Sequence, residues 1–329
     1  MRALPEFDAL IAPISEAQPC GESLEDTVLL ASFDAFRVFG HSLPPDPPPA
    51  WPTIRSEAAA ALARSKDVRL LAHLAAATLR TDGLAAFLNT IGVAAAWLET
   101  SWAATFPLVE EDAILRRNAL NCFSDQVAVI DGVRRAPLVA SREHGRISLR
   151  DVEMAAGLVA AGEGDTPPDS GRVTAAFGAV PLEALRALLE AVEVAGTALK
   201  AIDAKMRAEA GVEAAPSFDP LAAQLAKVTK TLRVQLTERG EAVGAVEGEE
   251  SAAALSGGGP IGAVRSRQDA IRALDAVAAF FRHAEPSSPV PFFLERAKRL
   301  VAKDFIEVLT DVAPGALSAA RDAVGLRDQ

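Results

Sequence analysis

Apolar residues recur every three to four positions between residues 54 and 105, the spacing that places them on one face of a helix. Polar breaks at 65–67 and 81–83 divide this stretch into three predicted helices. Before it, six prolines within 40–52 predict an exposed loop, because proline fixes φ and lacks a backbone donor. Trp51, near the end of that loop, is expected to anchor it on the core.

The pattern then becomes less regular. A further helix is predicted over 112–130. Two short segments, 137–140 and 145–147, suggest a small β-hairpin. Ser148 and Asp151 follow it with the spacing of a capping box, which predicts a short helix ending near residue 157.

The clearest periodicity is a heptad seam in the middle of the chain, where the apolar steps alternate between three and four residues. Its members are Leu185, Leu188, Val192, Ala195, Leu199, Ile202 and Met206, and the pattern returns after a turn at Leu221, Leu225, Val228 and Leu232. The seam predicts an antiparallel helical hairpin that packs on itself. A self-associating coiled coil is the alternative.

Two short amphipathic helices joined by a proline elbow are predicted near the C-terminus. Ser266 and Asp269 have capping-box spacing at the start of the first helix, and Pro286 and Pro289 separate it from the second. Two such helices bury little apolar area alone, which favours packing on a partner. The pattern as a whole predicts an all-α fold in four parts: an N-terminal helical domain at 1–165, a helical hairpin at 172–239, a flexible linker at 240–263 and a small oligomerisation domain at 264–329.

Composition and charge narrow the possible functions. The formal charge is −11, which argues against binding to a nucleic-acid backbone. The two cysteines, Cys20 and Cys122, lack the spacing of a metal or redox site and are expected to be reduced thiols in a cytoplasmic protein. The start of the chain does not have the pattern of a signal peptide, and no apolar run reaches the roughly 18 residues of a membrane span.

A search for catalytic chemistry finds none in the sequence. The four histidines, His41, His73, His144 and His283, are scattered and form no zinc-binding motif. His73 lies among apolar residues, so we interpret it as a core or interface histidine. Glycine-rich segments lack the lysine and the strand-to-helix context of a phosphate loop. The sequence therefore predicts neither an enzyme nor a cofactor.

Several ordered motifs nevertheless resemble one family. They include Pro19-Cys20-Gly21-Glu22-Ser23-Leu24, Trp51, the run Ser65-Lys66-Asp67-Val68-Arg69, and Leu149-Arg150-Asp151. A C-terminal element, with Glu285-Pro286-Ser287-Ser288-Pro289 and Leu294-Glu295-Arg296-Ala297, completes the set. In this order they resemble the short form of the TssA family of type VI secretion systems, whose N-terminal region is the ImpA N-terminal domain. The N-terminal motif residues singled out are Pro19, Cys20, Gly21, Leu24, Trp51, Asp67, Arg69 and Asp151.

The resemblance implies a non-enzymatic scaffold without a cofactor. Such proteins form rings of sixfold type and help to assemble the baseplate, tail tube and sheath of the secretion machine at the inner face of the cytoplasmic membrane. The partners that it implies are TssK, TssE, TssF, VgrG, Hcp, TssB and TssC. A monomeric or dimeric helical adaptor or assembly chaperone is the alternative.

The ring interface is predicted from the C-terminal aromatic residues. Adjacent residues cannot share the centre of one helical face, so one of Phe280 and Phe281, and one of Phe292 and Phe293, is expected to pack on a neighbouring subunit. The predicted interface consists of Phe280, Phe281, Glu285, Pro286, Pro289, Phe292, Phe293 and Arg296. A salt bridge within the chain is the alternative role of Glu285 and Arg296.

Overall fold

The structure is a computed structural model that describes residues 5–109, 113–162, 167–240 and 289–301, together with residues 274, 277, 278 and 281. The chain divides into two compact units, Met1–Ala245 and Val246–Gln329, called here the first and second units. The described residues are mostly helical. None of their helices is both long and apolar enough to cross a membrane.

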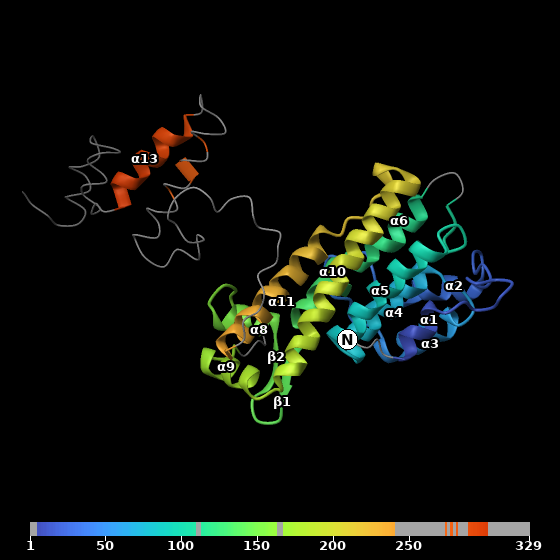
Figure 1. Cartoon of the computed structure of the whole chain (residues 1–329), viewed down its shortest axis with the longest axis horizontal. Helices are drawn as coiled ribbons and strands as arrows, with labels where there is room; N and C mark the ends of the chain where they lie inside the picture. Colours follow the sequence, from blue (N-terminus) through green and yellow to red (C-terminus); the bar gives the residue numbers. More distant parts are fainter. Residues whose placement is uncertain are drawn as a thin grey trace, which may run out of the picture. The chain divides into compact units, whose positions relative to one another are not determined.

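The first unit begins with five helices around a shared core (Figure 1). They are α1 (Pro5–Ile11), α2 (Val28–Ser32), α3 (Trp51–Leu62), α4 (Val68–Thr81) and α5 (Leu84–Thr100), with a 3₁₀ turn, η1, at Phe33–Phe36. The three helices predicted between residues 54 and 105 are confirmed. The two breaks have local causes: Asp67 caps the start of α4, and Gly83 has a φ of +93° ahead of α5.

The single helix predicted over 112–130 is wrong. The chain forms α6 (Ile114–Asn121), a 3₁₀ turn η2 (Cys122–Ser124), a π-helical turn η3 (Gln126–Ile130) and α7 (Asp131–Arg135). Asp125 causes the break, because its ψ of 131° lies outside the helical region. Its carboxylate then accepts hydrogen bonds from the backbone N–H groups of Val127 and Ala128, which starts the next turn.

A small antiparallel sheet corrects the all-α prediction. Strands β1 (Pro137–Ser141) and β2 (Gly145–Ser148) pair where the sequence suggests a hairpin. Ser148 and Asp151 then form the expected capping box at α8 (Leu149–Ala155). A further helix, α9 (Ser170–Gly178), follows, and the Asp169 carboxylate caps its start by accepting from the N–H of Arg172.

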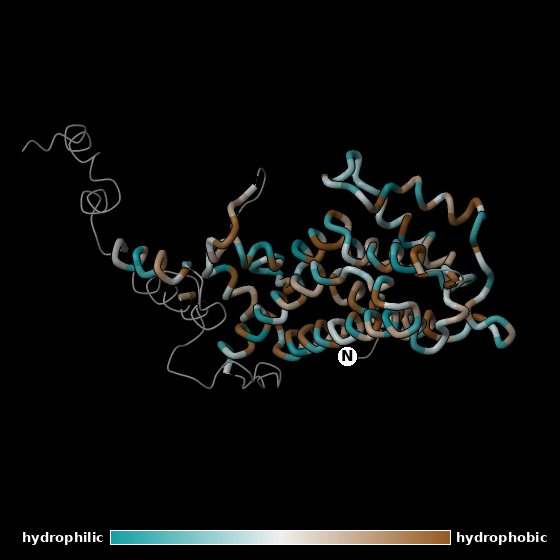
Figure 2. Tube along the Cα trace, turned by 90° about the horizontal axis from the view of Figure 1, so that it is seen from above, coloured by the Kyte–Doolittle hydropathy of each residue, from teal (hydrophilic) through white to brown (hydrophobic). Residues whose placement is uncertain are grey.

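The heptad seam forms the predicted helical hairpin. Its arms are α10 (Leu182–Ala210) and α11 (Asp219–Glu238), joined through a 3₁₀ turn η4 at Val212–Ala214. Almost all the seam residues are buried, with Leu188 partly so. Figure 2 shows apolar positions recurring between polar ones along the helices, as the periodicity predicts.

The hairpin also packs on the N-terminal helices. Helix α10 lies along α5 in the first unit, and their buried side chains join one continuous core (Figure 1). Ten of the seventeen residues of α5 are buried, because α1, α4 and α10 all pack against it. The described part of the hairpin therefore shares its core with α5 instead of standing apart. The domain boundaries themselves stay a prediction.

This shared core gives a prediction about fragments. The sequence predicts a separate N-terminal domain at 1–165, so a fragment 1–160 would be expected to fold by itself. That fragment lacks α10, however, and exposes the apolar side of α5 that α10 covers. We expect a fragment 1–240 to unfold in urea in one cooperative transition. We expect 1–160 to bind a hydrophobic dye and to unfold at a lower midpoint, because it exposes more apolar surface. Equal midpoints would contradict this view of the core.

The second unit contains α13 (Val290–Val301), which confirms the second predicted C-terminal helix. Leu274, Val277, Ala278 and Phe281, all within the first predicted C-terminal helix, are helical. Pro289 lies in a bend directly before α13. The predictions for the linker beyond residue 240, for the cap at Ser266 and Asp269, and for Phe280, Glu285 and Pro286 lie outside the described residues.

Candidate functional site

Four of the N-terminal motif residues, Pro19, Cys20, Gly21 and Asp67, lie at a junction of three chain segments, 19–22, 64–67 and 105–107. Lys66 connects all three: its N–H donates to the carbonyl of Cys20 at 2.8 Å, and its own carbonyl accepts from Phe106 at 3.0 Å. The N–H of Val68 then donates to the carbonyl of Phe106 at 2.8 Å. Segments separated by tens of residues in the sequence are therefore joined by backbone hydrogen bonds.

Gly21 permits the closest approach within this junction. A side chain at this position would place its Cβ 2.0 Å from the carbonyl oxygen of Arg64, and the φ of Gly21 is +76°. Only glycine fits both conditions without strain. The adjacent Cys20 is buried, with its Sγ 4.0 Å from the hydroxyl of Thr105, as expected for a small buried thiol.

Asp67 and Arg69 form a charged cluster at the start of α4. The Asp67 carboxylate is fully buried and accepts from the backbone N–H of Arg69 at 2.8 Å and from its guanidinium at 2.7 Å. Arg69 also pairs with Glu25 at 2.7 Å. Burial opposes the charge of Arg69, but its hydrogen bonds to both carboxylates outweigh that cost and raise its pKa above the usual value. The hydrogen bond that Arg69 donates to Glu25 lowers the pKa of Glu25. The cluster therefore fixes the start of α4 to the segment before α2.

Arg116, which no sequence motif marks, also supports the junction. Its side chain is fully buried and donates to three backbone carbonyls, those of Trp102, Thr105 and Pro107. Its guanidinium also lies 4.5 Å from the centre of the Trp102 ring. Burial lowers the pKa of Arg116 to about 10, so the group remains cationic at neutral pH.

Lys66 and Trp97 hold the end of α1. The ammonium of Lys66 donates to the carbonyl of Ile11 at 2.9 Å, and the indole N–H of Trp97 donates to the carbonyl of Leu10 at 2.7 Å. Carbonyls at the end of a helix lack partners within the helix, so these two side chains satisfy them. Burial lowers the pKa of Lys66.

Four N-terminal motif residues remain to be described: Pro19, Leu24, Trp51 and Asp151. Pro19 is exposed and Leu24 is buried in the core. Trp51 begins α3, is half-buried, and lies 5.3 Å from the guanidinium carbon of Arg80. Asp151 serves the capping box of α8. The motif residues are thus mainly parts of the scaffold of the first unit.

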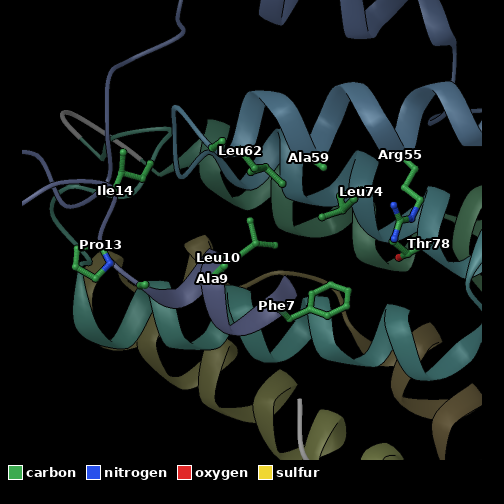
Figure 3. Close-up of a pocket in the computed structure, with 12 residues that line it drawn as sticks. Phe7, Ala9, Leu10, Pro13, Ile14, Arg55, Ala59, Leu62, Leu74 and Thr78 are labelled. Carbon is green, nitrogen blue, oxygen red and sulfur yellow. The ribbon is translucent and has the colours of Figure 1, made fainter. Parts of the chain in front are cut away.

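An apolar groove of about 430 Å³ lies between α1, α3 and α4 (Figure 3). Leu10 lies near its middle, Arg55 and Thr78 lie at one end, and Pro13 and Ile14 lie at the other. Both polar groups already have partners: Arg55 pairs with Asp82, and the Thr78 hydroxyl donates to the carbonyl of Ala75. The lining residues therefore do not include a nucleophile paired with a base.

No cluster of metal-binding side chains occurs within the described ranges. Cys20 and Cys122 are both free thiols, and burial raises the pKa of Cys122 to about 11, which keeps it protonated at neutral pH.

The second unit presents two aromatic residues to solvent. Phe292 and Phe293, in the first turn of α13, are 79% and 68% exposed. Pro289 and Arg296 are exposed, whereas Phe281 is half-buried. Exposed aromatic side chains side by side are uncommon on a monomeric surface and typical of a contact surface.

Two buried cations have roles that the sequence did not indicate. Arg116 and Lys66 are buried cations whose partners are backbone carbonyls, and a carbonyl has no sequence signature. Both look in the sequence like ordinary solvated residues. Only their contacts distinguish them.

Comparisons with known proteins match this chain to components of the type VI secretion system. Residues 11–125 match the family model described as "ImpA, N-terminal, type VI secretion system". The chain is 29% identical over 334 residues to "Type VI secretion system component TssA1" of Pseudomonas aeruginosa, across 95% of this chain and 96% of that protein.

A solved structure from Burkholderia cenocepacia shares the fold. It is described as the "N-terminal domain including the conserved ImpA_N region of the TssA component of the type VI secretion system", with a TM-score of 0.57 and 23% identity. The match covers 97% of that chain and 73% of this one. It therefore extends past the predicted first domain, which is about half of this chain, and includes part of the region beyond it.

Proposed function

We propose that this chain, a TssA homologue of the type VI secretion system, acts as a non-enzymatic scaffold that helps to assemble the baseplate and the tail tube and sheath. The observation that carries the proposal is the match to TssA1, which covers nearly the full length of both chains. The N-terminal and C-terminal parts of that component therefore both have counterparts in this chain.

We propose that the two units have different roles. The first unit has a continuous core fixed by buried polar contacts, which suits a rigid body that presents surfaces to partners. The second unit has the exposed pair Phe292 and Phe293, which suits self-association. We propose that the second unit closes a ring of sixfold type and that the first unit contacts the secretion machine.

The partners proposed for the first unit are the baseplate proteins TssK, TssE and TssF, with VgrG, Hcp, TssB and TssC as further components. We place the protein in the cytoplasm, with the machine at the inner face of the membrane. A monomeric or dimeric adaptor is the competing function. The mass of the purified chain separates the two, because only the ring requires six or more copies.

The decisive experiment combines mass with secretion. We expect light scattering of the purified chain to give at least six times the mass of one copy. We also expect deletion of its gene to stop release of the Hcp tube protein, with recovery on complementation. A stable monomer that still restores secretion would favour the adaptor, and normal secretion after deletion would contradict both functions.

A further inference from the structure

Helix α2 consists mainly of apolar residues, yet none of them is buried. Val28 is 87% exposed, and Leu29 and Leu30 are half-buried against the core. Leu24 before the helix and Phe33 after it are each 1% exposed, so they anchor its two ends. The helix therefore lies on the surface of the first unit and presents apolar side chains to solvent.

The backbone on both sides of this helix is held in an unusual conformation. Asp26 and Arg37 have φ values of +57° and +50°, and they are the non-glycine residues with positive φ in the described part of the chain. This conformation is strained for a residue with a side chain, and such strain is often found at binding sites. Between them, Thr27 caps α2, since its Oγ accepts from the N–H of Leu30 at 3.3 Å. Residues 26–37, called here the α2–η1 surface, thus hold exposed apolar side chains on a defined backbone.

The charge around the α2–η1 surface is predominantly negative. Asp26 and Asp34 are exposed carboxylates within it, and neither takes part in an ion pair among the described residues. Arg37 is the only cation in this stretch of the sequence. Just before it, Glu25 pairs with Arg69 at 2.7 Å, but Arg69 is shared with a second carboxylate and neutralises only part of the charge. An apolar surface with an acidic rim fits a partner with a basic rim, because like charges facing each other across an interface are unfavourable.

We propose that the α2–η1 surface binds a partner protein, and that the partner contributes an apolar segment flanked by lysine or arginine. This inference rests on the function proposed above, in which the first unit contacts the secretion machine, and it adds the surface and the chemistry of the partner. Val28 supplies the apolar contact, and Asp26 and Asp34 face the basic side chains of the partner. The same carboxylates repel an anionic membrane or a nucleic acid.

Two substitutions at one position test both parts of the proposal. Val28→Lys and Val28→Asp remove the same apolar side chain but add charges of opposite sign. Each variant replaces the native full chain in the host, and release of the Hcp tube protein is measured. We expect both to lower release, and Val28→Lys to lower it several-fold more, because a lysine repels a basic partner whereas an aspartate attracts it. Asp34→Lys, which leaves α2 unchanged, should lower release as well.

Leu158→Lys is the matched control, since Leu158 is 67% exposed and follows α8, which lies at the opposite end of the first unit from α2 (Figure 1). This variant should secrete like the native chain. Purified Val28→Lys should keep the native urea midpoint and the native mass by light scattering. If its midpoint falls, Ala31→Lys and Ala31→Asp, at another exposed position of α2, replace the pair.

The proposal is overturned if Val28→Lys secretes normally, or if Val28→Asp is as defective as Val28→Lys. A lower mass of Val28→Lys also overturns it, because the surface is then a contact between copies of this chain. The proposed function fails separately, if deletion of the gene leaves Hcp release intact. Deletion that stops release while Val28→Lys secretes normally contradicts the α2–η1 surface alone.

Discussion

Arg116→Met is expected to destabilise the first unit by about 3–5 kcal/mol, because it leaves buried carbonyls without a donor. Methionine has a similar length and keeps much of the packing on Trp102. The loss therefore reports the hydrogen bonds more than the volume. Urea unfolding of the full chain, followed by tryptophan fluorescence, measures it as a lower midpoint.

Two further variants make this result specific. Arg116→Lys keeps the charge but supplies fewer donors in a different geometry, so an intermediate loss is expected. Arg117→Met is the control, since Arg117 is the adjacent arginine of α6, is half-buried and donates to the carbonyl of Glu213 at 2.8 Å. Its effect should stay near 1 kcal/mol, the typical value of one hydrogen bond. Similar losses in Arg116→Met and Arg117→Met would refute the special role of Arg116.

Phe292→Asp is expected to dissociate the proposed ring and to abolish secretion. Phe292 is 79% exposed in α13, so the substitution should leave the helical content unchanged. Burial of such a ring at an interface contributes roughly 1.5–3 kcal/mol, and a closed ring repeats the contact at every interface. Light scattering at micromolar concentration measures assembly, and Hcp release measures function.

Val194→Asp supplies the matched control. Val194 lies on α10 in the first unit and is 59% exposed, so it tests the effect of a new charge on an exposed apolar position. This variant should still assemble. If Phe292→Asp and Phe293→Asp both remain assembled, the aromatic pair is not the ring interface. If they dissociate while Hcp release continues, the ring is not required for the scaffold function.

The motifs of the N-terminal region are informative for a structural reason. Gly21 packs closely against the backbone carbonyl of Arg64. The Asp67 carboxylate accepts hydrogen bonds from both the backbone N–H and the guanidinium of Arg69. Neither position tolerates a different side chain without loss of contact. The roles that the structure shows for these two motif residues are structural, Gly21 in the junction and Asp67 at the start of α4.

Local order along the chain was largely predictable. The helices α3, α4 and α5, the β-hairpin, the capping box at Ser148 and the α10–α11 hairpin all follow from spacing, breaks and caps. The single helix predicted over 112–130 was wrong because of Asp125. An aspartate in the middle of a helical pattern becomes a cap only when its carboxylate accepts hydrogen bonds from the next turn. Sequence pattern does not determine that choice.

The sequence by itself therefore determined the helical character of this protein, the positions of α3–α5, α8 and the α10–α11 hairpin, and its resemblance to a secretion component. Only the tertiary structure decided that α10 packs on α5, that Arg116 binds three carbonyls and that His73 lies between two phenylalanine rings. The physical reason is that periodicity shows which face of a helix is apolar, a local property, but does not show what covers that face. The covering residues lie far away in the sequence, and their position depends on the packing of the whole chain.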